Sequence, residues 1–361
     1  MMEEERTRLE LDHAIGYTGH FANTCLCHPT KSNTIVYNTG TVLVVSDTSS
    51  VPHKQQFIHG HDAEISAMCL SKSGKFLASG QLGSSKIAGD VAPVLVWDLE
   101  RLTNVYVFDI LKYEINSLSF SPDDRFLAAV SRNVCVIWDM EVGEMVTSKT
   151  LQKNINLMTW GRVTEDSRSS RCSYKLHLAC SSQVIMNSLD YDVATMRYVL
   201  RSEFATMPTG GLVRSYTSSI VPLQGGLFLL AGTENGEVCV FNTKHRIFRA
   251  SVTAAKNGVR TMCCSETDDT CLYIGAGDGT VTHFCGTDCH WKAQRSARVQ
   301  GKVMSLSVRA DGKSLLVGMS PPLSLSLLHT HTHTRHIFFC QVQVEEPCTK
   351  LNSTHSHPRS C

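Results

Sequence analysis

A pattern of short apolar strands recurs along most of this chain, and most copies close on a large apolar residue followed by a smaller, more polar one. The two clearest copies run from Gly60 to Asp98 and from Tyr113 to Asp139, and both end in Trp-Asp. Such a repeat constrains the fold strongly, because each unit must stack on its neighbours to bury its apolar strands. The ends of the third strands align at Ser46-Asp47, Trp97-Asp98, Trp138-Asp139, Leu189-Asp190, Phe241-Asn242 and Phe284-Cys285.

These markers lie 41 to 52 residues apart. A four-stranded propeller blade takes roughly 40 to 45 residues, and the longer intervals leave room for insertions. A further copy from Val303 to Gly318 has two strands and an Asp311-Gly312 turn. The spacing therefore predicts an all-β propeller over residues 1–319, with about seven four-stranded blades of which the last is incomplete.

Turn residues and polar insertions punctuate the copies. Asn235-Gly236 and Asp278-Gly279 stand between apolar runs, as in tight hairpins that need positive φ. Two insertions, Leu82 to Ala92 and the Ser/Arg-rich stretch Arg162 to Cys172, interrupt the second and fourth copies. We expect partner contacts at these loops, because loops on a rigid scaffold often carry function. The alternative is that both are tolerated insertions.

Upstream of the first copy, alternate apolar residues predict one more strand. Leu9, Leu11, Ile15 and Tyr17 fall on one face, with a break at His13. A ring of blades exposes two strand edges unless its ends are joined. We therefore predict that Leu9 to Tyr17 pairs into the last blade and closes the ring.

After Met319 the composition changes. Leu alternates with Ser over residues 323–327, and His alternates with Thr over residues 329–334. TC and CA dinucleotide repeats would encode such tracts, so we hypothesise that residues from about Ser320 onward are an intron-derived end that replaces the third strand of blade seven and whatever followed it. We predict a disordered, low-complexity tail over residues 320–361. The alternative, a metal-binding tract, is disfavoured because these histidines have no fixed fourth ligand: His329, His331 and His333.

Composition and charge narrow the class of protein. The chain is 42% hydrophobic and carries a formal net charge of +1, so it can build a core and has no global basic field for nucleic acid or anionic lipid. Met1 to Arg8 is charged, and no apolar run approaches the roughly 18 residues of a membrane span. We expect a cytoplasmic protein without membrane contact. Its 15 Cys are scattered through apolar runs, which indicates reduced thiols.

The Trp-Asp pairs at Trp97-Asp98 and Trp138-Asp139, the Gly-His pairs and the blade spacing resemble those of WD-repeat β-propellers over residues 9 to 318. The resemblance implies a hydrogen-bonded structural set of His61, Ser79, Asp90 and Trp97, and Gly19-His20 marks the same position in the first copy. The alternative is a hydrolytic triad of His61, Ser79 and Asp90 or Asp98. We favour the structural role, since no nucleophile elbow or oxyanion loop accompanies these residues.

Two other motifs have both a chemical and an ordinary interpretation. His283, Cys285, Cys289 and His290 form the densest group of possible zinc ligands, and an ordinary strand end with a loop is the favoured alternative. The glycine-rich run from Gly275 to Gly279 leads into a strand rather than a helix, so it lacks the helix N-terminus that binds phosphate. We therefore predict no metal, no cofactor, no small-molecule substrate and no enzymatic activity.

A narrower resemblance points to cilia. Short elements of the first copies are similar to the opening of the cilia- and flagella-associated protein 52 family: Leu9-Glu10-Leu11-Asp12, Ile15-Gly16, Gly19-His20, Cys27-His28-Pro29, Gly60-His61 and Ala78-Ser79-Gly80-Gln81. That family has two propellers in tandem inside the doublet microtubules of motile cilia. The last element is also similar to one in echinoderm microtubule-associated protein-like proteins. Blade four departs from the pattern, with Leu189 in place of Trp.

The resemblance implies a non-enzymatic scaffold of the axoneme, located in the cytoplasm, the cytoskeleton and the cilium. Its partners would be tubulin and neighbouring axonemal proteins, without nucleic acid or membrane. The alternative is a general WD-repeat adaptor in a cytosolic complex. A propeller fold by itself does not separate these functions.

Overall fold

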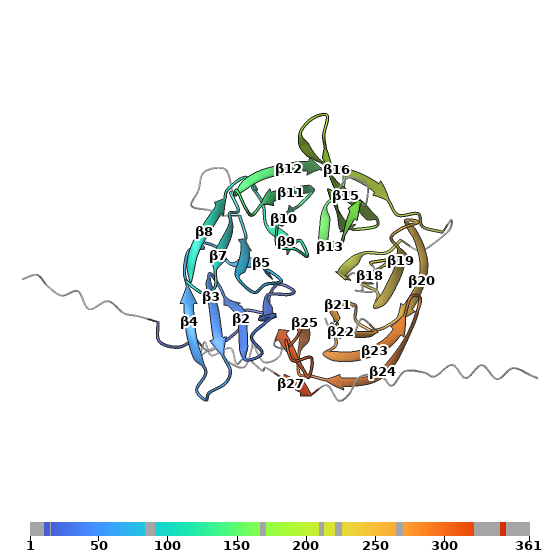
Figure 1. Cartoon of the computed structure of the whole chain (residues 1–361). Helices are drawn as coiled ribbons and strands as arrows, with labels where there is room; N and C mark the ends of the chain where they lie inside the picture. Colours follow the sequence, from blue (N-terminus) through green and yellow to red (C-terminus); the bar gives the residue numbers. More distant parts are fainter. Residues whose placement is uncertain are drawn as a thin grey trace, which may run out of the picture.

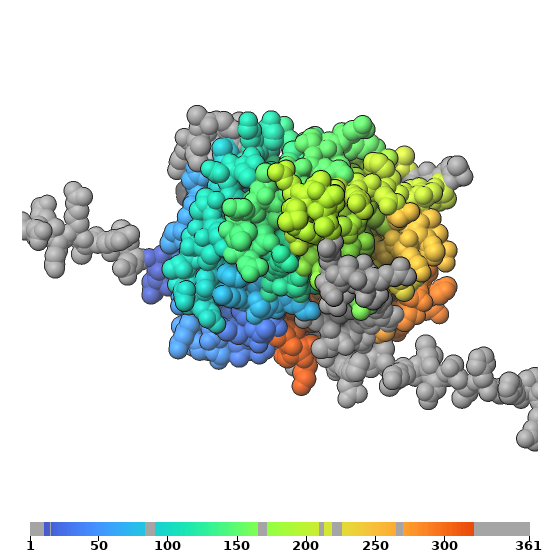
Figure 2. Space-filling view, turned by 45° about the horizontal axis from the view of Figure 1, so that its top comes forward, coloured from blue at the N-terminus to red at the C-terminus, as the bar shows by residue number. Residues whose placement is uncertain are grey.

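The structure is a computed structural model that describes residues 11–14, 16–83, 91–166, 171–208, 213–220, 226–264 and 270–320, and the backbone of 340–343. Four-stranded antiparallel sheets stand around a central axis like the blades of a propeller (Figure 1). In the space-filling view the blades follow one another around the body in chain order, from blue to orange (Figure 2). Among the described residues, no helix has the length and apolar character needed to cross a membrane.

The strands are assigned to blades in chain order. Blades one and two contain β1 (Cys25–Cys27), β2 (Thr34–Thr39), β3 (Val42–Asp47), β4 (Lys54–Ile58), β5 (Ile65–Leu70), β6 (Phe76–Gln81), β7 (Val94–Asp98) and β8 (Thr103–Phe108). Blades three and four contain β9 (Ile115–Phe120), β10 (Phe126–Ser131), β11 (Val134–Asp139), β12 (Glu144–Thr150), β13 (Ile155–Asp166), β14 (Arg171–Cys180), β15 (Val184–Asp192) and β16 (Arg197–Phe204). Blades five to seven contain β17 (Tyr216–Ile220), β18 (Phe228–Thr233), β19 (Glu237–Asn242), β20 (Ile247–Thr253), β21 (Val259–Cys264), β22 (Cys271–Ala276), β23 (Thr280–Thr287), β24 (His290–Arg298), β25 (Lys302–Val308), β26 (Ser314–Ser320) and β27 (Cys340–Gln343).

The all-β propeller expected from the repeat is confirmed. Within the described residues, six sheets have four strands and the seventh has three. The third strand of that sheet is β27, whose backbone pairs with Ser314 to Val317 of β26. This strand lies within residues 320–361, the segment expected to be a disordered tail. The rest of 321–361, including the His-Thr tract, lies outside the described residues.

The N-terminal segment reaches the junction of blades one and seven, but not as the predicted strand. Residues 11–14 and 16–17 form no strand, and Leu9, Glu10 and Ile15 lie outside the described residues. Tyr17 instead packs with Cys25 and Leu316 in a cluster at the junction. Hydrogen bonds close the ring there: Ser305 Oγ donates to Cys25 O at 2.6 Å, and Asn23 N donates to Met304 O at 2.9 Å.

Apolar residues fill the space between every pair of adjacent blades, because a strand that is buried on both sides needs apolar residues on both faces. In β14, Leu176 and Leu178 belong to a cluster with blade three, whereas Ala179 belongs to a cluster with blade five. The first strands of blades two to seven contact one another in succession, and β25 contacts β1.

A polar residue at the second position of the inner strand joins each of several blades to the next. Ser66 Oγ donates to Ile115 O at 2.8 Å, Asn116 Nδ2 to Ile155 O at 2.8 Å, and Asn156 Nδ2 to Tyr216 O at 3.1 Å. Thr217 Oγ1 donates to Val259 O in the same way. Each bond satisfies the first carbonyl of the next inner strand, which explains why a polar residue follows the first large residue of these strands.

The Asp that ends a third strand forms the turn that follows it. Asp98 Oδ1 accepts hydrogen bonds from the N–H groups of Glu100 and Arg101 at 2.9 and 3.0 Å, and Asp139 Oδ1 accepts one from Glu141 N at 2.9 Å. These bonds satisfy turn amides that the sheet leaves open. In blade four the turn Asp is Asp192, not the expected Asp190, because β15 continues for two more residues.

The predicted hairpin glycines adopt left-handed backbone angles. Gly236 has φ +87° and Gly279 has φ +85°, and the two residues follow Asn235 and Asp278 in the turns before β19 and β23. A Cβ at Gly236 would lie 1.8 Å from Ala255 O, so the turn also needs the missing side chain for space.

The insertion expected as a polar loop in blade four is largely strand. Residues up to Asp166 belong to β13 and residues from Arg171 belong to β14, and their backbones pair from Val163–Tyr174 to Asp166–Arg171. The resulting hairpin projects beyond the ring (Figure 1). Of the other insertion, residues 84–90 lie outside the described residues, including Asp90.

Candidate functional site

A chain of side-chain hydrogen bonds, most of them buried, joins β6 and β7 of blade two to the residues just before β5. Trp97 Nε1 donates to Ser79 Oγ at 2.8 Å, and Ser79 Oγ lies 2.7 Å from His61 Nε2. His61 Nδ1 lies 2.7 Å from Gln81 Oε1, and Gln81 Nε2 donates to Asp62 Oδ1 at 2.6 Å. Ser79 and Gln81 are fully buried, and His61 and Trp97 are nearly so.

The donor and the acceptor of each hydrogen bond in this network follow from the two groups at its ends, the Gln81 amide and the Trp97 indole. Gln81 Oε1 only accepts, so His61 Nδ1 carries the proton and Nε2 of the neutral ring must accept from the Ser79 hydroxyl. Ser79 Oγ in turn accepts from the Trp97 indole. Burial lowers the pKa of His61 to about 4, so the ring is neutral near pH 7. Each donor and acceptor in the set thus has one partner, as a buried polar network requires.

Three of the four residues expected in a structural set are brought together: His61, Ser79 and Trp97. Asp90 lies outside the described residues, and Asp98 caps a turn instead. Sequence analysis missed the role of Gln81 and of Asp62, although strand alternation already places Gln81 on the same face of β6 as Ser79. The position of the Trp97 ring also requires a glycine at position 60, because a Cβ there would lie 2.6 Å from Trp97 Cη2.

A hydrolytic role for this set is incompatible with its burial. Ser79 has no exposed surface, and its hydroxyl already donates to one neighbour and accepts from another. A nucleophile must reach its substrate, and a general base must be able to take up a proton near the working pH. Neither condition holds at Ser79 or His61. The network therefore positions strands rather than a reacting group.

Blade three repeats the tryptophan without its partners. Trp138 pairs with Leu127 as Trp97 pairs with Leu77, which places Ala129 at the position of Ser79. Trp138 is buried against Phe108, with ring centroids 4.5 Å apart and nearly parallel planes. Within the described part of the chain, its Nε1 has no hydrogen-bond partner. The second Trp-Asp copy therefore holds its tryptophan by packing alone.

The first copy differs again. His20 was expected at the position of His61, but its ring is half exposed and its Nδ1 lies 2.7 Å from Glu64 Oε1. The half-exposed ring of His20 therefore does not stand in a buried network like the one that contains His61 in blade two.

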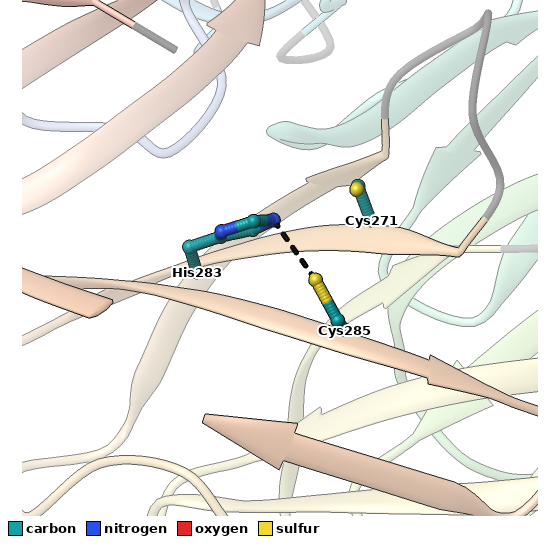
Figure 3. A group of neighbouring side chains, drawn as sticks. All are labelled: Cys271, His283 and Cys285. Atoms are coloured by element: carbon teal, nitrogen blue, oxygen red, sulfur yellow. Dashed lines mark hydrogen bonds between the residues drawn. The ribbon is translucent and has the colours of Figure 1, made fainter. Parts of the chain in front are cut away.

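Three possible metal ligands meet on adjacent strands of blade six. Cys271 of β22 pairs directly with Cys285 of β23, and His283 stands two residues earlier on the same face (Figure 3). Their ligand atoms lie within 4.8 Å of one another, and His283 Nε2 lies 3.5 Å from Cys285 Sγ. Sequence analysis named His283 and Cys285 and missed Cys271, which only the pairing of β22 with β23 brings close.

This group is not a complete metal site. Cys285 is disulfide-bonded, which corrects the expectation that all thiols are reduced, and a disulfide sulfur is a poor metal ligand. The other two predicted ligands, Cys289 and His290, follow in the turn and at the start of β24. Eleven cysteines of the described residues take no part in a disulfide. Burial raises the pKa of several of them, as with Cys135 to about 12.

The inner strands leave a cavity at each of their two ends. At their C-terminal ends, a cavity of about 450 Å³ is lined by residues that include Leu26, Cys69, Phe120 and Trp160. At their N-terminal ends, a cavity of about 360 Å³ is lined by residues that include Asn23, Glu114, Asn116, Asn156 and Arg260. Burial raises the pKa of Glu114.

Comparisons with known proteins agree with the fold. The family profile for the WD domain, G-beta repeat, matches residues 53–87, and the profile for the WD40 domain of anaphase-promoting complex subunit 4 matches residues 96–163. Among solved structures, the RRP9 WD40 repeats superpose with a TM-score of 0.64 at 14% identity, covering 84% of this chain and 89% of that chain. U3-55K superposes with a TM-score of 0.63 at 14% identity, covering 83% and 89%.

The fold, the Trp-Asp turns and these matches define the class of protein: the chain is a WD40-repeat β-propeller. Within that class it resembles cilia- and flagella-associated protein 52. The protein of that name from Chlamydomonas reinhardtii is 28% identical over 86% of this chain and 48% of its own length, and the one from Bos taurus is 26% identical over 87% and 48%. The chain thus spans about half the length of these relatives. Human WD repeat-containing protein 90 is 27% identical over 65% of the chain and 13% of its own length.

Proposed function

We propose that the chain is a non-enzymatic interaction scaffold of motile cilia or flagella, incorporated into the axonemal doublet microtubules. The observation that carries this proposal is the similarity to cilia- and flagella-associated protein 52 from an alga and a mammal along nearly the whole propeller. Tubulin and neighbouring axonemal proteins are the partners that this position implies. The proposal locates the protein in the cytoplasm, the cytoskeleton and the cilium.

The geometry of the propeller supports a scaffold. The polar network of blade two is buried and its members bond to one another, which suits a role in stabilising the blade rather than in acting on a substrate. The blades instead offer cavities and long turns around a rigid ring, which suits binding to other proteins. A formal net charge of +1 fits attachment through many shaped contacts, because such attachment needs no strongly basic surface.

A localisation and extraction experiment tests the proposal. A tagged form of the full-length protein is expressed in multiciliated cells, and isolated axonemes are then extracted with detergent and with high salt. We expect axonemal signal that survives both treatments, because a protein built into the microtubule wall or lumen is held by many contacts at once. Signal that stays in the cytosol, or that is released by salt alone, would contradict incorporation.

The second candidate is a general WD-repeat adaptor in a cytosolic complex. The likeness to the RRP9 and U3-55K propellers, at 14% identity, shows the fold alone and is compatible with this function too. Recovery of the tagged chain in a soluble complex of defined composition, with no signal in cilia, would favour the adaptor.

A further inference from the structure

A polar groove of about 360 Å³ lies between blade four and the first turns of blade five. Its walls are β13 to β16, the residues before β18 and the turn between β19 and β20. Five of its lining side chains are cationic and one is anionic: Arg162, Lys175, Arg201, Lys244, Arg246 and Glu203. This charge imbalance is local, since the chain as a whole has a formal net charge of +1.

The pleat of blade four explains how the cations gather. Lys175 pairs with Ser188, and Ser188 pairs with Arg201, so these three residues form a row across β14, β15 and β16. The next row contains His177, Met186 and Glu203. Alternate residues of β14 pack toward blade three, so this face turns toward blade five. Side chains of this face line the groove together with two turns of blade five.

Only one cation in the groove is neutralised. Arg246 Nε lies 2.8 Å from Glu203 Oε2. Among the described residues, the other four cationic side chains form no salt bridge. Lys175 Nζ donates to Ser173 Oγ at 3.2 Å, and Ser173 Oγ donates in turn to the carboxylate of Asp190, so within the described residues only Arg162, Arg201 and Lys244 have no acidic group in their hydrogen-bond network. Uncompensated cations that share one depression attract anionic groups strongly, because low-dielectric walls focus their field.

A buried histidine in the groove provides a second, independent observation. His177 lines the groove and is only 4% exposed, yet within the described part of the chain its Nδ1 has no hydrogen-bond partner. Burial lowers the pKa of His177 to about 4, so its ring is neutral and offers one N–H and one lone pair. Buried polar atoms of native proteins usually have a partner. A bound ligand group would supply one.

We propose that this groove binds an acidic segment of a partner polypeptide, whose carboxylates contact the cationic side chains. The residues that line the groove include no Phe, Tyr or Trp. Single-stranded nucleic acid is usually held by aromatic side chains on which its bases stack, so the lining favours a peptide. The proposal goes beyond the ciliary function and does not depend on it, because the groove can be tested with purified protein.

The test uses the full chain and a fluorescent peptide of roughly ten glutamates, measured by fluorescence anisotropy at about 50 mM and about 200 mM salt. The groove variant is Arg201→Glu with Lys244→Glu. The matched control is Arg197→Glu with Lys292→Glu, which changes the net charge equally at exposed positions on β16 and β24. We expect the groove variant to bind the peptide at least about tenfold more weakly, and the control to bind within about twofold of the parent.

Three outcomes would overturn the proposal. The first is equal weakening in the two variants, which would show attraction by net charge alone. The second is the absence of peptide binding by the parent chain at about 50 mM salt. The third is tighter binding of a phosphorylated peptide or of uridine oligonucleotide of the same charge. A further variant, His177→Phe, keeps a buried ring without N–H, and we expect it to bind about threefold more weakly while its circular dichroism is unchanged.

Discussion

The indole N–H of Trp97 donates a 2.8 Å hydrogen bond to the hydroxyl of Ser79, and this bond begins a chain of four that ends at Asp62. Forty-one residues later, Trp138 occupies the same register with Ala129 at the position of Ser79, and its indole N–H has no partner within the described part of the chain. One blade is thus held by a polar network and the next by packing. This difference gives two predictions about stability.

Substituting Ser79→Ala should lower the free energy of unfolding by roughly 2 to 5 kcal/mol, because it leaves Trp97 Nε1 and His61 Nε2 buried without partners. Urea denaturation followed by circular dichroism measures the change. In a Trp97→Phe background the same substitution should cost less, since one of the two orphaned groups is already absent. Equal costs in the two backgrounds would mean that Ser79 and Trp97 are not coupled.

Substituting Ala129→Ser should be tolerated better than Ala128→Ser, by about 1 kcal/mol. Both alanines are fully buried, but Ala129 lies in the cluster that contains Trp138, whereas Ala128 lies in the cluster shared with blade four. A hydroxyl at Ala129 can accept from the orphaned indole N–H. Thermal unfolding of the two variants compares them directly, and a more stable Ala128→Ser protein would refute the assignment.

Acid should destabilise the fold through two buried histidines. The pKa values of His61 and His177 fall from 6.5 to about 4, mainly through burial. Between those values the unfolded chain binds a proton that the folded chain does not, so the free energy of unfolding falls as the pH falls. The loss should be roughly 2 kcal/mol for each histidine between about pH 7 and about pH 5.

Urea titrations at the two pH values check this dependence. His177→Gln should remove the contribution of one histidine to this difference. If His177→Gln keeps the full difference, His177 is not a source of the acid sensitivity.

The junction of blades one and seven should be the weakest point of the ring. Ser305→Ala removes the hydrogen bond from Ser305 Oγ to Cys25 O, at a place where no short chain connection holds β1 against β25. We expect faster amide exchange in both strands, measured by mass spectrometry. Ser66→Ala removes a similar bond between the consecutive blades two and three, and serves as the control. Similar exchange at both junctions would show that closure is not a special weakness.

Much of the fold follows from local features of the sequence. Strand alternation, Trp-Asp endings and the Asn-Gly and Asp-Gly turns each constrain a few adjacent residues, and together they predict the propeller. The part of the fold that was predicted wrongly also has a local cause. Nothing in Arg162 to Cys172 distinguishes a polar loop from a polar hairpin, because strands that leave the body of a protein carry no buried face to give an apolar pattern.

The sequence by itself determined the repeat and the blade class, since these depend on spacing within one blade, and the resemblance to WD-repeat propellers implied the set of His61, Ser79 and Trp97. Only the tertiary structure decided which other residues contact the residues of these patterns. Gln81 accepts a hydrogen bond from His61, Cys271 lies close to His283 on the adjacent strand, and the indole N–H of Trp138 has no acceptor within the described part of the chain. The cationic groove likewise combines side chains of blade four with turns of blade five. Such contacts join residues that the periodic pattern does not relate, so they form only when the ring is assembled.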